Sequence, residues 1–196
     1  MVTNHSERKS PMRIGIDIDG TLNDLHKPWL ELYVEKSGDR IRKENIFDYD
    51  ISKFVLPTWE KKIFELLNTP NIFRNAPVQE NAIESIKQLQ DWGNEIYFIS
   101  AFHPFYQSIP EKYQWLQEHF DFVDLKKAVF FCQEKHLIGV DVLIDDCFAN
   151  IENRAMNQID ILFDQPWNHL NYFVNRAIGW QGVMTILEEF GARNGH

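Results

Sequence analysis

Several acidic, hydroxyl and basic residues are placed where they could do chemistry together. Asp17 and Asp19 lie in the sequence Asp-Ile-Asp-Gly-Thr, which continues a short apolar run. Farther along the chain, a serine, a lysine and a pair of adjacent aspartates stand beside other short apolar runs; these are Ser100, Lys135, Asp145 and Asp146. In open parallel α/β sheets, ligands bind outside the carboxyl ends of the strands. We therefore expect these side chains to converge at one edge of a sheet.

The charges of this group indicate what chemistry it could perform. Carboxylates held close together repel one another unless a cation joins them. Mg²⁺ prefers oxygen ligands, keeps several of its waters and binds substrate phosphates. In extended backbone alternate side chains point the same way, so Asp17 and Asp19 could both face one substrate. The pattern predicts phosphoryl chemistry assisted by Mg²⁺, with one aspartate as nucleophile and the other as acid and base.

Each of these residues taken singly also has an ordinary structural interpretation. Asp145 and Asp146 could cap the start of a helix. Ser100 could be a loop serine, and Lys135 could be a solvated surface lysine. The functional interpretation depends on their joint occurrence, in order, at or beside the ends of predicted strands.

The elements that must position these residues are visible as short apolar runs. Five runs predict strands, and they cover Arg13–Ile18, Glu95–Ser100, Ala128–Cys132, Val140–Asp145 and Asp160–Phe163. Segments with helical spacing of apolar residues separate them. Strands that alternate with helices indicate a parallel sheet covered on both faces. The predicted fold class is α/β, with a Rossmann-like parallel sheet core of about five strands.

Local signals predict where helices of this core begin and end. Pro77 suits the first turn of a helix, and Gly93 suits its C-terminal cap. Ser108 and Glu111 have the spacing of a capping box, which predicts that their side chains cap the next helix. A last helix is predicted over Ile178–Phe190.

The segment 24–76 interrupts the regular alternation of strands and helices. Asp17 and Ser100 are 83 residues apart, whereas a direct β–α–β crossover needs about 30. The surplus falls in residues 24–76, which are rich in aromatic residues and have helical apolar spacing. We expect a small helical insertion there, so that the core consists of residues 11–23 and 77–196.

Composition limits the classes of partner and location. The chain of 196 residues has 20 Lys and Arg against 29 Asp and Glu, a net charge of −9. This balance argues against a nucleic-acid-binding surface, which needs a basic patch. Two cysteines, Cys132 and Cys147, are too few for a disulfide framework and fit a reducing compartment. Residues 1–11 lack the apolar stretch of a signal peptide, and no apolar run approaches the ~20 residues that cross a bilayer. We expect a cytoplasmic protein with no membrane or nucleic-acid partner.

The chain carries four short motifs in order: Asp17–Thr21, Ser100, Lys135 and the pair Asp145 and Asp146. They resemble the four motifs of the haloacid dehalogenase-like phosphohydrolase superfamily. Within it, Glu111–Trp115 (EKYQW) and Asp141–Asp146 (DVLIDD) are similar to the 5'(3')-deoxyribonucleotidase family. The resemblance covers most of residues 13–164. It implies a Mg²⁺-dependent phosphomonoesterase whose substrate is a small phosphorylated molecule, a (deoxy)nucleoside monophosphate. It also implies that residues 24–76 are a helical cap, which excludes water and shapes the leaving-group pocket.

The resemblance implies catalytic roles for four residues. Asp17 is similar to the nucleophile, which attacks phosphorus to give an aspartyl-phosphate. Asp19 is similar to the acid that protonates the leaving oxygen and then activates the hydrolytic water; haloacid-processing members lack an acid there. Ser100 would donate a hydrogen bond to the phosphate. Lys135 would neutralise charge on both the phosphate and Asp17.

The resemblance likewise implies a set of Mg²⁺ ligands. These would be the carboxylate of Asp17, the backbone carbonyl of Asp19, and Asp146. Asp145 would lie just outside the ligand set, although the sequence does not order the two adjacent aspartates.

The residues that would recognise the leaving group are less sharply indicated. Aromatic residues of segment 24–76 could stack on a nucleobase, but for most of them the core of the cap is the better explanation. The family places an aromatic residue shortly after the Asp-x-Asp-Gly motif, and Leu25 occupies that position here, with Trp29 as a substitute nearby. His103 and Phe105 follow Ser100 and could border the pocket. The run Asp164–Asn168 follows the fifth predicted strand and receives no role.

Two other functions are compatible with part of this pattern. The same mechanism could act on sugar phosphates or other small phosphomonoesters. Alternatively, the acids could hold a metal or phosphate in a non-catalytic binding module. Simple binding needs no acid or base at Asp19, so the full set favours an enzyme, a phosphoric monoester hydrolase. The family also suggests a homodimer, for which no sequence feature gives independent support.

Overall fold

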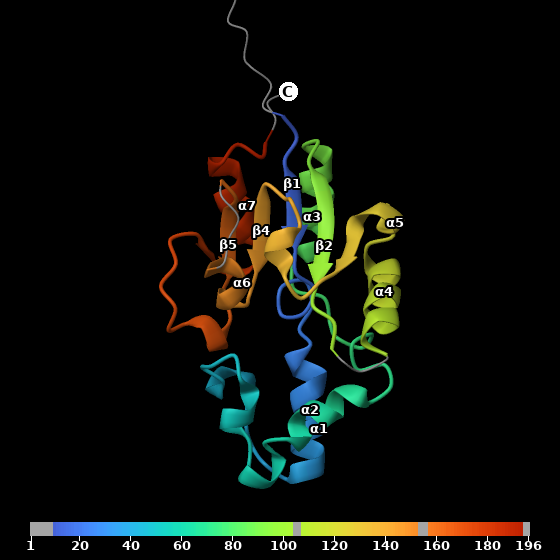
Figure 1. Ribbon diagram of the computed structural model, residues 1–196, viewed down its shortest axis with the longest axis vertical. Helices are drawn as coiled ribbons and strands as arrows, with labels where there is room; N and C mark the ends of the chain where they lie inside the picture. The colour runs from blue at the N-terminus through green and yellow to red at the C-terminus, as the bar shows by residue number, and fades with distance from the viewer. Residues whose placement is uncertain (1–9, 104–106, 153–156, 194–196) are drawn as a thin grey trace, which may run out of the picture.

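The structure, a computed structural model, describes residues 10–103, 107–152 and 157–193. Within these residues, six strands form one parallel sheet in the order β3-β2-β1-β4-β5-β6 (Figure 1). The strands are β1 Arg13–Ile16, β2 Glu95–Ser100, β3 Val129–Phe131, β4 Val142–Asp145, β5 Ile159–Phe163 and β6 Arg176–Ala177. Because β2, β1 and β4 are neighbours, the loops that follow them emerge side by side at the carboxyl edge of the sheet.

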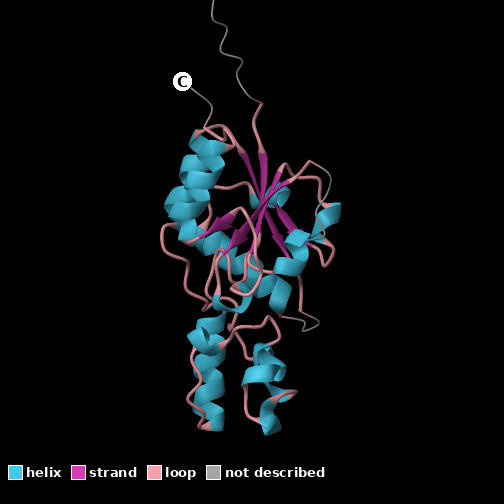
Figure 2. Cartoon of the chain, turned by 90° about the vertical axis from the view of Figure 1, so that its left-hand side faces the viewer, coloured by secondary structure: helices cyan, strands magenta, loops and turns pink. Residues whose placement is uncertain are grey.

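Helices lie on both sides of the sheet, as Figure 2 shows. The helices are α1 His26–Ser37, α2 Lys62–Glu65, α3 Ala82–Asp91, α4 Ser108–His119, α5 Leu125–Ala128, α6 Phe148–Glu152 and α7 Gly179–Glu189. Helices α3, α4 and α7 contribute to the larger core cluster, and α6 contributes Ile151 to a smaller one. The two clusters lie on opposite faces, since neighbouring residues of β4 join different clusters: Ile144 the larger and Leu143 the smaller. The α/β prediction is confirmed.

The first strand shows how its sequence suits the centre of the sheet. Ile14 and Ile16 are fully buried in the larger cluster. Gly15 faces the other side, where an added Cβ would lie 2.6 Å from Ile99 Cδ1 and 3.1 Å from Val140 Cγ2. A side chain at position 15 would therefore force the side chains of Ile99 and Val140 to shift.

Residues 24–76 form a separate packed unit beyond the carboxyl edge of the sheet, at the lower end of Figure 1. Apart from α1 and α2, its helical elements are short 3₁₀ turns over Lys43–Asn45, Ile51–Phe54, Pro57–Trp59 and Leu66–Asn68, joined by loops. Its buried residues, among them Trp29, Tyr33 and Phe73, make a hydrophobic cluster of their own, which Trp167 joins from the core. The helical character predicted for this segment is thus present, but mostly as single turns.

One local prediction for the core is wrong at its start, and one strand is missing from the prediction. The helix predicted to start at Pro77 begins instead at Ala82, after an isolated bridge between Asn23 and Val78. The sheet has a sixth strand, β6, that was not predicted because its two residues are too short to show any alternation.

The predicted capping box at the start of α4 is also absent. Ser108 is the first helical residue, and its Oγ donates a hydrogen bond to the carbonyl of His103 (3.1 Å). The Glu111 carboxylate instead accepts from the backbone N–H groups of Asn71 (2.7 Å) and Phe73 (3.2 Å). Glu111 therefore ties α4 to segment 24–76 rather than closing its own helix.

The described residues include no helix that is both long and apolar enough to cross a lipid bilayer.

Candidate active site

A pocket of about 150 Å³ lies between the carboxyl edge of the sheet and segment 24–76. It is lined by Asp17, Asp19, Leu25, His26, Trp29, Tyr49, Phe64, Ser100, Ala101, His103, Lys112, Lys135, Asp146 and Asn150. Five of the six residues predicted to converge therefore line one pocket, and Asp145 adjoins it, as its bond to Lys135 shows. One end of the pocket is polar and charged, and the other is largely apolar.

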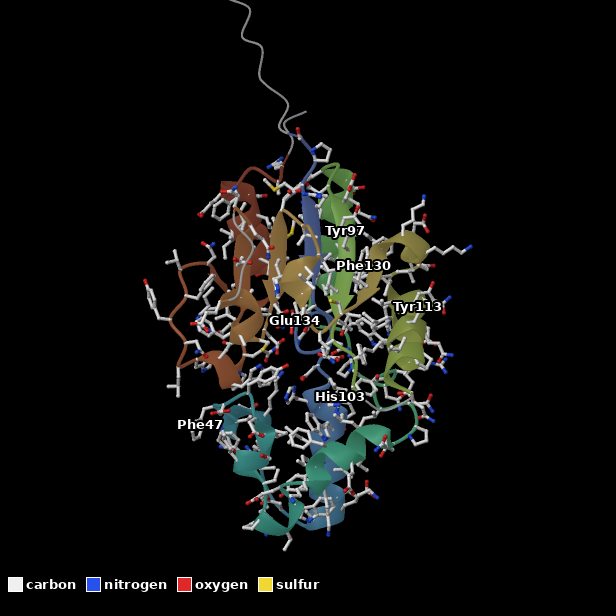
Figure 3. The ribbon with its side chains drawn as sticks, viewed as in Figure 1. Phe47, Tyr97, His103, Tyr113, Phe130 and Glu134 are labelled. Carbon is white, nitrogen blue, oxygen red and sulfur yellow. The ribbon has the colours of Figure 1, made fainter. Side chains whose placement is uncertain are left out.

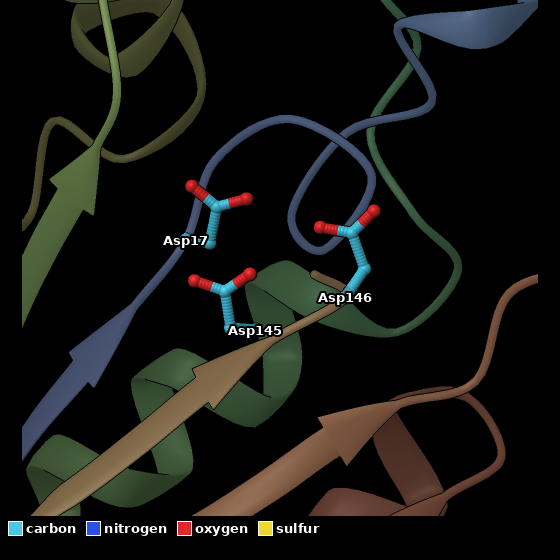
Figure 4. A group of neighbouring side chains, drawn as sticks. All are labelled: Asp17, Asp145 and Asp146. Carbon is cyan, nitrogen blue, oxygen red and sulfur yellow. The ribbon is translucent and has the colours of Figure 1, made fainter. Parts of the chain in front are cut away.

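Three buried carboxylates meet at the charged end, those of Asp17, Asp145 and Asp146 (Figure 4). Each offers one oxygen, and these oxygens all lie within 4.8 Å of one another. Asp17 follows β1 directly, while Asp145 ends β4 and Asp146 follows it. Adjacent parallel strands thus bring together acids that are more than 120 residues apart in the sequence.

Lys135 supplies one positive charge to this group. Its Nζ donates to Asp17 Oδ1 (2.5 Å) and to Asp145 Oδ2 (2.7 Å), and its side chain is 2% exposed. Burial opposes its charge, but the carboxylates of Asp145 and Asp17 more than compensate and raise the pKa of Lys135. Lys135 is therefore a fixed cation bridging two of the three acids.

One ammonium does not neutralise three buried carboxylates. Burial raises the pKa of Asp17 to about 7, and the negative charges of Asp145 and Asp19 act in the same direction. Burial, with the charges of Asp17 and Asp145, also raises the pKa of Asp146 well above its usual range. A cluster of this kind favours a bound cation, which would relieve the repulsion.

The two adjacent aspartates differ in their hydrogen-bond partners. Asp145 Oδ1 accepts from the backbone N–H of Cys147 (2.8 Å), and its Oδ2 accepts from Lys135 and from Asn150 Nδ2 (3.0 Å). Asp146 accepts at Oδ2 from Trp167 Nε1 (2.8 Å). Both oxygens of Asp145 are thus engaged by protein donors, which distinguishes two residues that the sequence leaves unordered.

Asp19 and Ser100 meet at a second ammonium, which sequence reasoning missed. Lys112 Nζ lies 2.5 Å from Asp19 Oδ2 and donates to Ser100 Oγ (3.0 Å) and to the Ala101 carbonyl (2.6 Å). Its side chain is 2% exposed, although it lies in the middle of α4. The sequence does carry a signal that Lys112 is buried, because helical spacing places it on the same buried face as Ser108 and Trp115.

Gly20 allows the loop after β1 to pass close to Asp146. Its φ is +86°, a backbone conformation that favours glycine. A Cβ at this position would overlap the Asp146 carboxylate and lie 3.2 Å from the Trp167 ring. The turn at Gly20 is therefore also a close approach between the two acidic loops.

The apolar end of the pocket comes mostly from segment 24–76. Leu25 and Trp29 line it, and both are nearly buried. Trp29 is already engaged within the segment, since its Nε1 donates to the Ile63 carbonyl (2.7 Å). His103, labelled in Figure 3, lines the pocket, whereas Phe105 lies outside the described residues.

Cys147, beside Asp146, behaves as an inert buried residue. Its side chain is largely buried, and burial together with the charges of Asp145 and Asp146 raises the pKa of its thiol to about 12. A thiol of this kind is a poor nucleophile at neutral pH.

The sequence is similar to those of proteins named as deoxyribonucleotidases over most of its length. Residues 10–193 match the family described as 5' nucleotidase, deoxy (pyrimidine), cytosolic type C protein. A 5'(3')-deoxyribonucleotidase of Clostridium acetobutylicum is 36% identical over 175 residues, which are 89% of this chain and 94% of that protein.

Two solved structures support the fold. A haloacid dehalogenase-like protein of unknown function from Agrobacterium tumefaciens has a TM-score of 0.63 at 13% identity, covering 92% of this chain and 99% of that one. A haloacid dehalogenase-type hydrolase of Bacillus subtilis, solved with bound magnesium, has a TM-score of 0.54 at 13% identity, covering 91% and 99%. Together with the match over residues 10–193, these findings show that the chain belongs to the cytosolic type C 5'-nucleotidase family, phosphoric monoester hydrolases with the haloacid dehalogenase fold.

Proposed function

We propose that this protein is a Mg²⁺-dependent phosphatase that hydrolyses (deoxy)nucleoside monophosphates through an aspartyl-phosphate on Asp17. The observation that carries the proposal is the position of Asp17. It is buried next to Asp145 and Asp146, and Lys135 donates to it from 2.5 Å. The name of the Clostridium relative supports the choice of substrate.

The donor set fits a hard divalent cation. Three buried carboxylates with one nearby ammonium leave negative charge that oxygen-loving Mg²⁺ would neutralise. We assign its binding to the carboxylates of Asp17 and Asp146 and to the backbone carbonyl of Asp19. Asp145 stays outside this set because Lys135, Asn150 and a backbone N–H already engage its oxygens. The bound ion would offset phosphate charge and hold the phosphate against the nucleophile.

The chain's own residues then divide the work of two displacements. The Asp17 carboxylate attacks phosphorus, the bond from phosphorus to the leaving oxygen breaks, and Asp19 gives that oxygen a proton. Asp19 next takes a proton from water, whose oxygen attacks the phosphorus and releases Asp17 and inorganic phosphate. Lys112 holds Asp19 and Ser100 together, and Ser100 and Lys135 bind the phosphate oxygens. Catalysis is mainly positioning and charge stabilisation, as expected for phosphoryl transfer.

Residues 24–76 act in this proposal as the cap, and residues 11–23 and 77–196 as the core. The cap supplies the apolar wall of the pocket through residues such as Leu25, Trp29 and Phe64. A nucleobase placed against this wall would be removed from water and gain binding energy.

The proposal is tested by comparing substrates with and without metal. A deoxynucleoside monophosphate should be hydrolysed with at least ~10-fold higher kcat/KM than deoxyribose 5-phosphate, because one stacked base contributes about 1.4 kcal/mol or more. EDTA should abolish both activities, and Asp17→Asn should lower kcat at least ~10³-fold. Equal efficiency on both substrates would indicate a general sugar phosphatase. Metal binding without hydrolysis of either would indicate a binding module.

A further inference from the structure

The segment Asp164–Asn168, which follows β5, contacts both acidic loops of the site. Gln165 Nε2 donates to the carbonyl of Gly20 (2.5 Å), in the loop after β1. Asn168 Nδ2 donates to the backbone carbonyl of Asp146 (2.8 Å), in the loop after β4. Side chains of one short segment therefore hold the two loops that carry the candidate nucleophile and the candidate metal ligand.

Trp167, in the middle of this segment, contacts the proposed metal ligand Asp146 directly. Its indole Nε1 donates to Asp146 Oδ2 at 2.8 Å, and the residue is 3% exposed. A hydrogen bond from a buried donor to a carboxylate is stronger than one between neutral groups and fixes the carboxylate's orientation. Asp146 is thus held at its backbone by Asn168 and at its side chain by Trp167.

The face of the Trp167 ring contacts residues of the cap. The imidazole of His26, in the first turn of α1, stacks on it with ring centroids 3.9 Å apart and planes 25° apart. The ammonium of Lys43 lies 5.4 Å from the ring centroid and pairs with Asp24 at 2.9 Å. Trp167 is counted within the hydrophobic cluster of residues 24–76, although it comes from the core.

We infer that Trp167 is a positioning residue that links docking of the cap to the orientation of the metal ligand Asp146. One indole group makes both contacts: the N–H at its edge bonds to Asp146, and its ring face stacks on His26. Seating of the cap on the ring fixes the indole, and the fixed indole fixes the carboxylate. The inference rests on the proposed role of Asp146 in binding Mg²⁺, and it assigns Trp167 no contact with the substrate.

The test compares two tryptophans that lose the same group. Trp167→Phe keeps an aromatic ring against His26 and removes the N–H that reaches Asp146. Trp115→Phe is the matched control, because Trp115 is fully buried and its Nε1 donates to a backbone carbonyl, that of Ala76 (2.7 Å). Each variant is titrated with Mg²⁺ while the thermal midpoint is followed, and separately while phosphatase activity is followed.

Trp167→Phe should need about 10-fold more Mg²⁺ than wild type in both titrations, as is typical when a partner of a metal ligand is lost. At saturating Mg²⁺ its KM should be unchanged, whereas Trp167→Ala, which also loses the stack on His26, should raise KM for the nucleotide at least fivefold. Trp115→Phe should lower the thermal midpoint without changing the Mg²⁺ requirement. A Mg²⁺ requirement of Trp167→Phe within twofold of wild type would overturn the inference.

A second variant approaches the same link from the cap. His26→Ala leaves the Trp167 N–H in place and removes the ring that seats it, so the Mg²⁺ requirement should rise about threefold in the thermal titration. Unchanged Mg²⁺ binding in His26→Ala would contradict the coupling even if Trp167→Phe did not fold. If Mg²⁺ did not change the thermal midpoint of wild type, the proposed metal site would be wrong. If Mg²⁺ changed the midpoint of wild type and of both variants equally, the metal site would stand and the coupling through Trp167 would be wrong.

Discussion

Removing the charge of Asp17 should stabilise the metal-free protein at neutral pH. Burial raises the pKa of Asp17 from 3.8 to about 7. Between these values the folded protein keeps a proton on Asp17 that the unfolded chain has lost, so stability falls as the pH rises. At 1.36 kcal/mol per pH unit the full loss of stability is about 4 kcal/mol, and more than half of it falls between pH 5 and 7.5.

The assay is urea unfolding in EDTA, at pH 5 and at pH 7.5, of wild type and Asp17→Asn. Asparagine keeps the shape and can still accept from Lys135, but it does not titrate. The free energy of unfolding of Asp17→Asn should therefore exceed that of wild type by about 4 kcal/mol at pH 7.5, and by less at pH 5. Mg²⁺ should raise the stability of wild type at pH 7.5 by mass action and that of the variant much less.

Asp141→Asn is a control with the opposite sign. The hydrogen bond from Arg13 lowers the pKa of Asp141 below its usual range, so its charge stabilises the fold at neutral pH and this contribution is lost as the pH falls. Asp141→Asn should therefore destabilise the protein at pH 7.5 and less so in acid. The reasoning about Asp17 would be refuted if Asp17→Asn showed the same change in stability between pH 5 and 7.5 as wild type.

Three further outcomes follow from the site. Asp19→Asn should slow hydrolysis of nucleotides more than that of p-nitrophenyl phosphate, because nitrophenolate leaves without a proton; equal losses in kcat would argue against an acid role. Lys112→Met should lower kcat on the order of 10²-fold by releasing Asp19 and Ser100, while exposed Lys127→Met, assayed alongside, should match wild type. Glu111→Gln has one carboxamide oxygen for two backbone N–H groups of segment 24–76. Urea unfolding should therefore show a free energy of unfolding about 1–3 kcal/mol lower than that of wild type. An unchanged free energy of unfolding would mean that these hydrogen bonds make no net contribution to stability.

The parts of the site that could be predicted are those that follow a strand. Asp17, Ser100 and Asp146 were expected at one edge because parallel strands end together, and the structure brings them to one pocket. Lys135 was expected beside them and does bond to Asp17. This prediction needs only that the strands run parallel in one sheet, so that their carboxyl ends share one edge.

The parts that could not be predicted depend on partners far away in the sequence. Glu111 has the local spacing of a capping residue, yet its donors lie 38 and 40 residues away. Lys112 sits within a helix whose pattern gives no hint of the carboxylate that it meets. Trp167 follows a strand, but its ring packs among residues more than 90 positions earlier. Short-range patterns identify elements, whereas these contacts depend on how the elements are assembled.

The place of Trp167 in the hydrophobic cluster of segment 24–76 has a consequence for synthesis of the chain. About 90 residues separate the end of that segment from Trp167. At the usual 5–20 residues per second, a ribosome takes roughly 5 to 20 s to cover this distance. During that interval the nascent segment lacks the indole that fills its cluster, and β1 still awaits β4. Apolar surface of this segment therefore stays exposed until Trp167 emerges, and a chaperone could bind the nascent chain at that stage.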